Sequence, residues 1–301
     1  MTTITQPEWN DLKVFLELAR SKKISVAGEK LGVEHSTVSR RVDRLEKSLN
    51  TVLFDRRRDG YSLTDAGVAL IPYAERMEAA MLSAMDESAG RAAGISGTVR
   101  VGTPEAFGIK ILAPNLLDLY RRYPKISVEL MAQPQFPSLV TREVEILVTM
   151  EPPRIGRYTA ARLAEVDYYL YGSPEYLKQC DPIKDLSDVA NHWFLDYIHD
   201  GAVSERYKIL DELTKTPNRR FTSTSVLAQK AAAVAGMGLV LLTPFVAEGD
   251  GVLTSIFPNK PLITRTLWIV APEDLFRIRR VRCVWDHIRE IVALRPDLFR
   301  K

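Results

Sequence analysis

The chain of 301 residues lacks the features that mark secreted and membrane-embedded proteins. It has only two cysteines, Cys180 and Cys283, without CxxC spacing, which is typical of unpaired thiols in a reducing compartment. No apolar run approaches the roughly 18 residues that a membrane span needs, since Gly238–Val246 is short and broken by Thr243-Pro244. The first residues lack the basic start and apolar core of a secretory signal. We therefore expect a cytoplasmic protein that does not enter the membrane.

Motifs of common enzyme classes are also missing. GxSxG, HExxH and P-loop patterns do not occur, and the four histidines have no ligand-like spacing. Gly236-Met237-Gly238 follows a predicted helix and precedes a predicted strand, the reverse of the order in a dinucleotide-binding loop. We therefore expect no enzyme activity, no cofactor and no metal site, and an enzyme is the weakest alternative.

Positive charge is concentrated near the N-terminus. Residues 1–58 contain 12 Lys and Arg against 8 Asp and Glu, whereas the rest of the chain contains 29 against 30. A basic N-terminal segment on a nearly neutral remainder favours nucleic acid as the partner of that segment.

Apolar periodicity in the first fifty residues predicts three short helices. The first covers 9–20, the second follows Ser25 as its N-cap and ends at Gly32, and the third covers roughly 35–49. Ala27 and Gly28 are small, which lets the third helix cross the second closely. Two short helices joined by a tight glycine-containing turn form the helix-turn-helix pattern.

The third helix has one apolar stripe and one polar stripe. Val38, Val42 and Leu45 share a face at 100° per residue, which predicts the buried side. The opposite face offers hydroxyl and guanidinium groups, which suit base edges and phosphates in the major groove. A solvated basic face is the alternative, but the preceding helix and turn favour DNA. The candidate DNA-binding residues on this helix are His35, Ser36, Thr37, Ser39, Arg40, Arg41 and Arg44.

The segment LFDRRRDGYSL at 53–63 predicts a hairpin. Asp59-Gly60 is a turn pair between two short strands, and Phe54 and Leu63 are expected to anchor the hairpin to the core. Such a wing contacts phosphate or the minor groove. Its candidate DNA-binding residues are Arg56, Arg57 and Arg58.

A long helix is predicted from the cap Thr64 to about Ala93. Its apolar and small residues repeat every 3.5 residues on average, the period of a coiled coil, which favours self-association as a dimer or tetramer. Packing against its own chain is the alternative. Pro72 is expected to kink the helix or to shift its regular start. The residues assigned to the subunit interface are Leu70, Ala74, Met77, Met81 and Ala84.

After 94–97 strands alternate with helices, the order of parallel α/β sheets. The length suits two lobes of about 100 residues each. The predicted helices cover 111–123, 226–235 and 277–294, and the predicted strands cover 98–102, 127–132, 144–150, 166–172, 220–224, 238–244 and 266–271.

Several segments share their order and spacing with one protein family. They are SRRVDRLE (39–46), LFDR (53–56), LTDAG (63–67), REVEILV (142–148), YGSPEYL (171–177), the stretch 226–247 and LWIVAPED (267–274). On these segments the chain resembles the LysR-type transcriptional regulator family over essentially its whole length. Two positions depart from that family: Glu34-His35-Ser36 replaces a Ser-Gln-Pro-like segment, and Glu145 stands where Asp is common.

The resemblance implies an α/β protein with an N-terminal winged helix-turn-helix, a long linker helix and a two-lobed periplasmic-binding-protein-like effector domain. The expected boundaries are 1–63, 64–94 and 95–301. Within the last, lobe I is expected at about 97–165 and 270–301, and lobe II at about 166–269. Promoter DNA, a small-molecule effector and RNA polymerase are the implied partners of a homotetramer. A small-molecule receptor that acts through protein partners is the alternative.

The candidate effector site follows from the strand ends. Ligands of open α/β sheets bind at the carboxyl ends of parallel strands, near helix N-termini. If the chain crosses between lobes near 162–168 and returns near 267–271, these ends meet at one cleft. No arginine is clearly directed there, so helix dipoles and hydroxyls would hold an anionic ligand. The candidate residues are Thr103, Pro104, Phe107, Gln133, Thr149, Tyr197, Thr224, Ser225, Val226 and Thr243.

Overall fold

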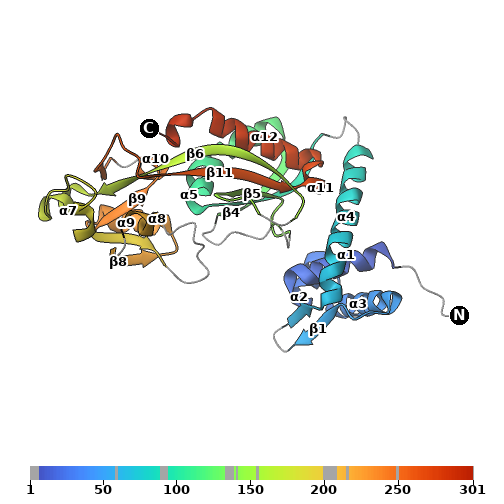
Figure 1. Ribbon diagram of the computed structural model, residues 1–301. Coiled ribbons are helices and arrows are strands. Elements are labelled where there is room, and N and C mark those ends of the chain that lie inside the picture. The colour runs from blue at the N-terminus through green and yellow to red at the C-terminus, as the bar shows by residue number, and fades with distance from the viewer. Residues whose placement is uncertain are drawn as a thin grey trace. The chain divides into compact units, whose positions relative to one another are not determined.

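The computed structural model describes residues 7–57, 60–88, 94–132, 139, 142–153, 156–198, 209–214, 217–248 and 251–300. The chain divides into two compact units, one of residues 1–93 with 141–143 and one of residues 94–140 with 144–301 (Figure 1). No helix in the described ranges is long and apolar enough to cross a membrane.

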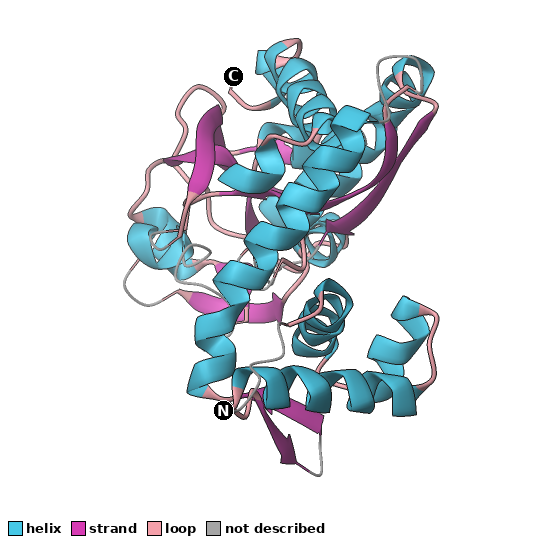
Figure 2. Cartoon of the chain, turned by 90° about the vertical axis from the view of Figure 1, so that its right-hand side faces the viewer, coloured by secondary structure: helices cyan, strands magenta, loops and turns pink. Residues whose placement is uncertain are grey.

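The N-terminal unit contains the predicted helices and hairpin (Figure 2). The helix predictions for 9–20 and 35–49 are confirmed within one residue. The cap prediction for Ser25 is wrong: the second helix begins at Ile24 after an extended Lys23, so Ser25 lies in its first turn. The elements are α1 (Trp9–Ser21), α2 (Ile24–Leu31), α3 (His35–Leu49), β1 (Phe54–Arg57), β2 (Gly60–Leu63) and α4 (Asp65–Ser88).

Two glycines shape the turn between α2 and α3. Gly32 closes α2 with a φ of 64°, a left-handed conformation that glycine adopts without steric cost. A Cβ on Gly28 would lie 2.7 Å from the Val33 carbonyl oxygen, so only glycine allows this close crossing. Both predictions for the turn are confirmed.

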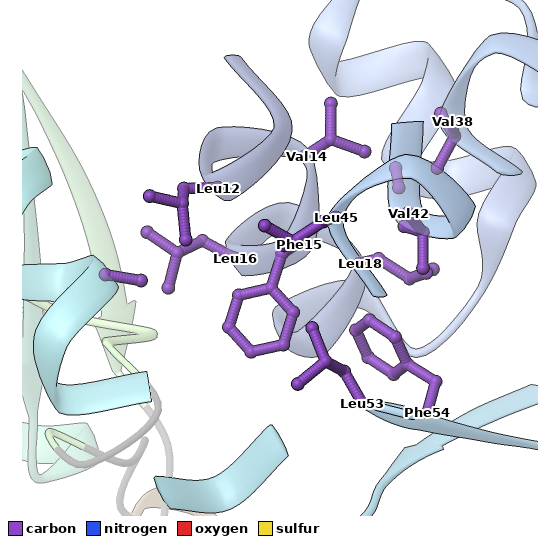
Figure 3. Close-up of a cluster of buried hydrophobic side chains, with 12 residues drawn as sticks. Leu12, Val14, Phe15, Leu16, Leu18, Val38, Val42, Leu45, Leu53 and Phe54 are labelled. Carbon is purple, nitrogen blue, oxygen red and sulfur yellow. The ribbon is translucent and has the colours of Figure 1, made fainter. Parts of the chain in front are cut away.

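The core of this unit is built from the apolar stripes of α1 and α3. Figure 3 shows Phe15 and Leu16 of α1 beside Leu45 of α3, with Leu53 and Phe54 at the start of the hairpin completing the cluster. All five side chains are at most 3% exposed. Burial of such side chains is worth about 1.5–3 kcal/mol each, so the core fixes which face of α3 remains in water.

The hairpin is joined to α3 by the Glu46 carboxylate. Its Oε1 accepts hydrogen bonds from the backbone N–H groups of Leu53 at 2.7 Å and Phe54 at 3.1 Å. Both residues are buried, so water cannot replace this acceptor. The carboxylate therefore sets where the hairpin leaves the core.

The long helix α4 begins as predicted but tolerates its proline. The Thr64 hydroxyl accepts a hydrogen bond from the Gly67 N–H at 3.1 Å, which confirms Thr64 as the cap. Pro72 lies inside the helix and does not move its start. The described helix ends at Ser88, and the expected continuation to Ala93 lies outside the described residues.

The second unit contains a mixed sheet in which nine of the described strands are joined in the order β4-β3-β5-β11-β6-β9-β7-β8, with β10 on β6. The expectation of parallel pairing holds only in part, for β3 with β4 and β5 and for β7 with β8 and β9. The strands are β3 (Ser96–Thr103), β4 (Lys125–Ala132), β5 (Ile146–Thr149), β6 (Tyr158–Gly172), β7 (Trp193–Tyr197), β8 (Asn218–Ser223), β9 (Leu239–Leu242), β10 (Thr254–Ser255) and β11 (Ile263–Pro272).

Helices and helical turns connect these strands. These helices and turns are α5 (Glu105–Phe107), a π-helical turn (Gly108–Leu112), α6 (Ala113–Arg122), α7 (Pro174–Gln179), a 3-10 turn (Asp188–Asn191), α8 (Ile209–Leu213), α9 (Val226–Val234), α10 (Pro244–Ala247), α11 (Glu273–Phe276), α12 (Arg279–Ala293) and a last 3-10 turn (Pro296–Leu298). The sequence did not predict the short elements β7, α7, α8 and α10.

Two long strands carry the chain between the halves of this sheet. β6 and β11 run antiparallel from Tyr168 opposite Ile263 to Tyr158 opposite Pro272, and Figure 1 shows them as the longest ribbons of the unit. β5 pairs with β11 at one end, and β9 pairs with β6 at the other. β6 includes the predicted crossing near 162–168, and β11 begins at Ile263, slightly before the expected return at 267–271.

Glu145, one of the two positions that depart from the family pattern, is part of a half-buried ion pair. Its carboxylate accepts a hydrogen bond from the Arg100 N–H at 3.1 Å and from an Arg280 guanidinium nitrogen at 2.8 Å. Burial raises the pKa of Glu145, and Arg280 opposes that shift. The longer side chain thus ties α12 to the middle of β3.

We expect Glu46→Ala to lower the free energy of unfolding of the N-terminal unit by about 1–3 kcal/mol, because two buried N–H groups lose their acceptor. Hydrogen–deuterium exchange of peptides covering 51–64 in the full-length protein measures the change. Glu29→Ala, on an exposed position of α2, is the control and leaves the exchange unchanged. Equal protection in Glu46→Ala and the unaltered protein would contradict the role of Glu46.

Candidate functional site

The exposed face of α3 is polar and shallowly hollowed. Because Val38, Val42 and Leu45 are at most 1% exposed, the opposite face of the helix stays in water. A hollow on that face is lined by Ser36, Ser39, Arg40, Asp43, Arg44 and Lys47. Four of these six residues are candidates from the sequence.

Among the other candidates on α3, His35 is exposed, while Thr37 and Arg41 are half-buried. His35 is the first residue of the helix, and its predecessor Glu34 makes no side-chain cap. The first turn of α3 therefore carries several hydrogen-bonding side chains in water.

Arg44 has a structural partner that the sequence did not reveal. Its guanidinium donates to both carboxylate oxygens of Asp11 at 2.5 Å and to Glu8 at 3.1 Å, which joins α3 to α1. The hydrogen bond with Asp11 raises the pKa of Arg44. Asp11 itself is 1% exposed, so this charge needs its partner. A DNA contact of Arg44 would have to share its donors with Asp11.

The wing arginines are also paired within the unit. Arg56 donates to Asp43 of α3, and Arg57 lies 3.9 Å from an Asp55 carboxylate oxygen. Both arginines remain exposed. Arg58 lies outside the described residues, as does Asp59.

An apolar stripe is exposed along the second half of α4. Met77 is 47% exposed, Met81 46% and Met85 60%, and Ala84 is exposed as well. Leu70 and Ala74 differ from the prediction, because they pack against the core of the N-terminal unit and Ala74 is fully buried. The position of α4 is held by a two-pronged ion pair between Arg20 and Glu78, with N–O distances of 3.1 and 2.7 Å.

The second unit contains a cleft between the two halves of its sheet. The empty space, its open mouth included, is about 870 Å³. A space of this size suits a small molecule. Most of its walls are apolar, including Phe107, Phe194 and Phe245.

Most candidate effector residues of the sequence lie at this cleft. Thr103, Thr149 and Ser225 stand at the same strand ends but do not line it, and Gln133 lies outside the described residues. Thr149 is fully buried and bonds to the Glu151 backbone. The candidates that line the cleft are Pro104, Phe107, Tyr197, Thr224, Val226 and Thr243.

The charged side chains at the cleft have partners on the protein. Asp196 is 6% exposed and accepts a hydrogen bond from Arg219 Nε at 2.8 Å. Arg265 lines the cleft and donates to Glu212, so one arginine lies there but is already paired. Glu105 bonds to Ser225 and Val226.

Two buried threonine hydroxyls lack partners among the described residues. They belong to Thr103, which is fully buried, and Thr243, which is 5% exposed and lines the cleft. A buried hydroxyl without a partner costs free energy. The Thr243 hydroxyl is thus available to a bound molecule.

The sequence reasoning missed several lining residues. Glu105 directly follows the candidate junction Thr103-Pro104, so its position was a usable signal. Tyr168 and Arg265 lie on the crossing strands, where only the pairing of β6 with β11 brings them to the cleft. In the part of the chain that the structure describes, no cluster of His, Cys, Asp or Glu is arranged to hold a metal ion.

Two family descriptions match the chain. Residues 9–68 match "Bacterial regulatory helix-turn-helix protein, lysR family", and residues 92–293 match "LysR substrate binding domain". The first match lies in the N-terminal unit, and the second lies almost entirely in the second unit.

Similar proteins span the whole chain. The HTH-type transcriptional regulator PtxR of Pseudomonas aeruginosa is 24% identical over 294 residues, with 95% of this chain and 94% of that protein covered. The HTH-type transcriptional activator TtdR of Escherichia coli is 25% identical over 295 residues, with 92% of each covered.

A solved structure supports the same fold. A full-length OxyR variant from Pseudomonas aeruginosa has a TM-score of 0.74 at 18% identity, with 94% of this chain and 98% of that chain covered. With a winged helix-turn-helix unit, an α/β unit and both family matches in place, the chain belongs to the LysR family of bacterial helix-turn-helix transcriptional regulators.

Proposed function

We propose that the protein binds promoter DNA through the exposed face of α3 and that a small molecule in the cleft of the second unit controls this regulator. The observation that carries the proposal is the hollow on α3, where Ser36 and Arg40 are exposed beside Lys47 and Ser39 is half-buried. A second helix of a helix-turn-helix inserts such a face into the major groove. The family matches support the same reading.

Within this face, we assign different tasks to the arginines. Arg40 is exposed and free to bond bidentately to guanine, while Arg41 lies half-buried on the flank. Arg44 and Arg56 are held by Asp11 and Asp43, so they suit phosphate contacts that leave the pair intact. The hairpin carries the phosphate-binding wing.

The exposed stripe of Met77, Met81, Ala84 and Met85 on α4 supports self-association. Exposed apolar side chains in a continuous stripe mark an interaction surface, and methionines adapt to a partner surface. A two-fold dimer would present two α3 helices to two half-sites of a palindrome. A tetramer, contact with RNA polymerase and a cytoplasmic location belong to the same proposal.

The cleft supports the effector role because ligands bind where the ends of parallel strands face each other across two halves of a sheet. A molecule that binds one arrangement of the halves better than another shifts the population of that arrangement. The difference between its binding free energies for the two arrangements is then available to change the DNA-binding state.

Arg40→Ala should weaken operator binding by about 1–3 kcal/mol, or about 5- to 150-fold, because a base-contacting guanidinium is lost. Fluorescence anisotropy with the upstream intergenic DNA measures the affinity at fixed salt. Arg289→Ala, an exposed arginine of α12, is the matched control and keeps the affinity. An Arg40→Ala protein with unchanged affinity would remove Arg40 from the interface.

Met81→Glu should raise the dissociation constant of the dimer by about 100-fold. Each subunit would bury an unpaired carboxylate at a cost of about 1.4 kcal/mol or more. Sedimentation velocity over a concentration series measures the constant. Val68→Glu, 58% exposed and on the opposite side of α4, is the control. An unchanged constant in Met81→Glu would place the interface elsewhere.

Thr243→Val should stabilise the effector-free protein by about 1 kcal/mol, because it removes a buried hydroxyl without a partner. Calorimetry detects this as a higher midpoint of unfolding. Thr222→Val, at an exposed position of β8, is the matched control with no rise. A lower midpoint in Thr243→Val would show that this hydroxyl already has a partner in the free protein.

A further inference from the structure

Glu105 connects the two halves of the second unit across the cleft. It begins α5 shortly after β3, whereas Ser225 caps α9 and Val226 begins that helix shortly after β8. One carboxylate oxygen of Glu105 accepts a hydrogen bond from Ser225 Oγ at 2.8 Å, and the other accepts from the Val226 N–H at 3.0 Å. Glu105 and Val226 both line the cleft.

The carboxylate occupies the position where an anionic ligand would bind. α9 has nine residues, and the free N–H groups of its first turn carry partial positive charge. Ser225 Oγ accepts from the Ala228 N–H at 3.1 Å, and its proton is donated to Glu105. The Val226 N–H is also taken by Glu105. The hydroxyl and the first amide of this helix are therefore already satisfied.

The other charges at the cleft do not offer a replacement anion site. Arg265 is paired with Glu212, and Asp196 adds a second carboxylate that Arg219 neutralises. No ion pair of Glu105 with a cation is found in the described part of the chain, so its negative charge is balanced only by dipoles. Among the buried polar atoms of the wall, the neutral Thr243 hydroxyl is the one that has no partner in the described ranges.

We propose that Glu105 determines the ligand specificity of the cleft: its carboxylate fills the anion position at the start of α9, so the cleft excludes small carboxylates and takes a neutral or cationic apolar molecule. From the sequence we expected helix dipoles to hold an anionic ligand. In the structure the Glu105 carboxylate, an anion of the protein itself, occupies that position. This inference rests on the proposed effector role of the cleft.

Glu105→Ala tests the proposal, because the atoms that it removes correspond to acetate. At about 100 mM sodium acetate and neutral pH, the midpoint of thermal unfolding of the full-length variant should rise by about 3 °C relative to equimolar sodium chloride. The unaltered protein should show no rise, since its own carboxylate fills the position. Glu175→Ala, which removes an exposed glutamate from the first turn of α7, is the matched control without a rise.

Glu105→Gln is a second control, because its amide still fills the space and should block acetate. The absence of an acetate-specific rise in Glu105→Ala, or an equal rise in the unaltered protein, would overturn the proposal. If Glu105→Ala is recovered poorly, acetate but not chloride in the refolding buffer should restore its yield, and failure to do so also overturns the proposal. Operator binding by the unaltered protein tests the regulator function separately, because acetate binding to the variant does not depend on DNA.

Discussion

The requirement that each helix of the N-terminal unit bury one apolar stripe decides what this unit presents to a partner. α3 turns Val38, Val42 and Leu45 toward α1, and this burial leaves Ser36 and Arg40 in water. Burying these side chains is worth several kcal/mol in total, far more than any single surface contact. Packing of the core therefore keeps the polar face in water, and the ion pair of Arg44 with Asp11 only adjusts the position of that face.

The second unit depends in the same way on one pair of strands. β6 and β11 extend through both halves of the sheet, so the cleft lies where the two halves meet and not within either one. Its walls combine residues from α5, β7, α9 and the crossing strands. Because Glu105 bonds across this junction, the same carboxylate joins the two halves and fills the anion position.

Much of the architecture could be predicted, because it follows from local periodicity. The helices at 9–20 and 35–49, the Gly32 turn and the hairpin required only the spacing of apolar residues and glycines. The long helix shows the limit of this reasoning. Leu70 and Met77 belong to the same 3.5-residue pattern, yet Leu70 packs against the core of its own unit while Met77 is exposed. A repeat identifies an apolar face but not which surface covers each turn of it.

The sequence by itself determined the family and the polar face of α3, since these depend on neighbours a few positions apart and on motifs in fixed order. Only the tertiary structure decided which charges are free. The pairs Arg44–Asp11, Arg265–Glu212 and Glu105–Ser225 join residues separated by 33, 53 and 120 positions. No local pattern encodes such pairs, because the chain brings them together only when the core and the sheet have formed.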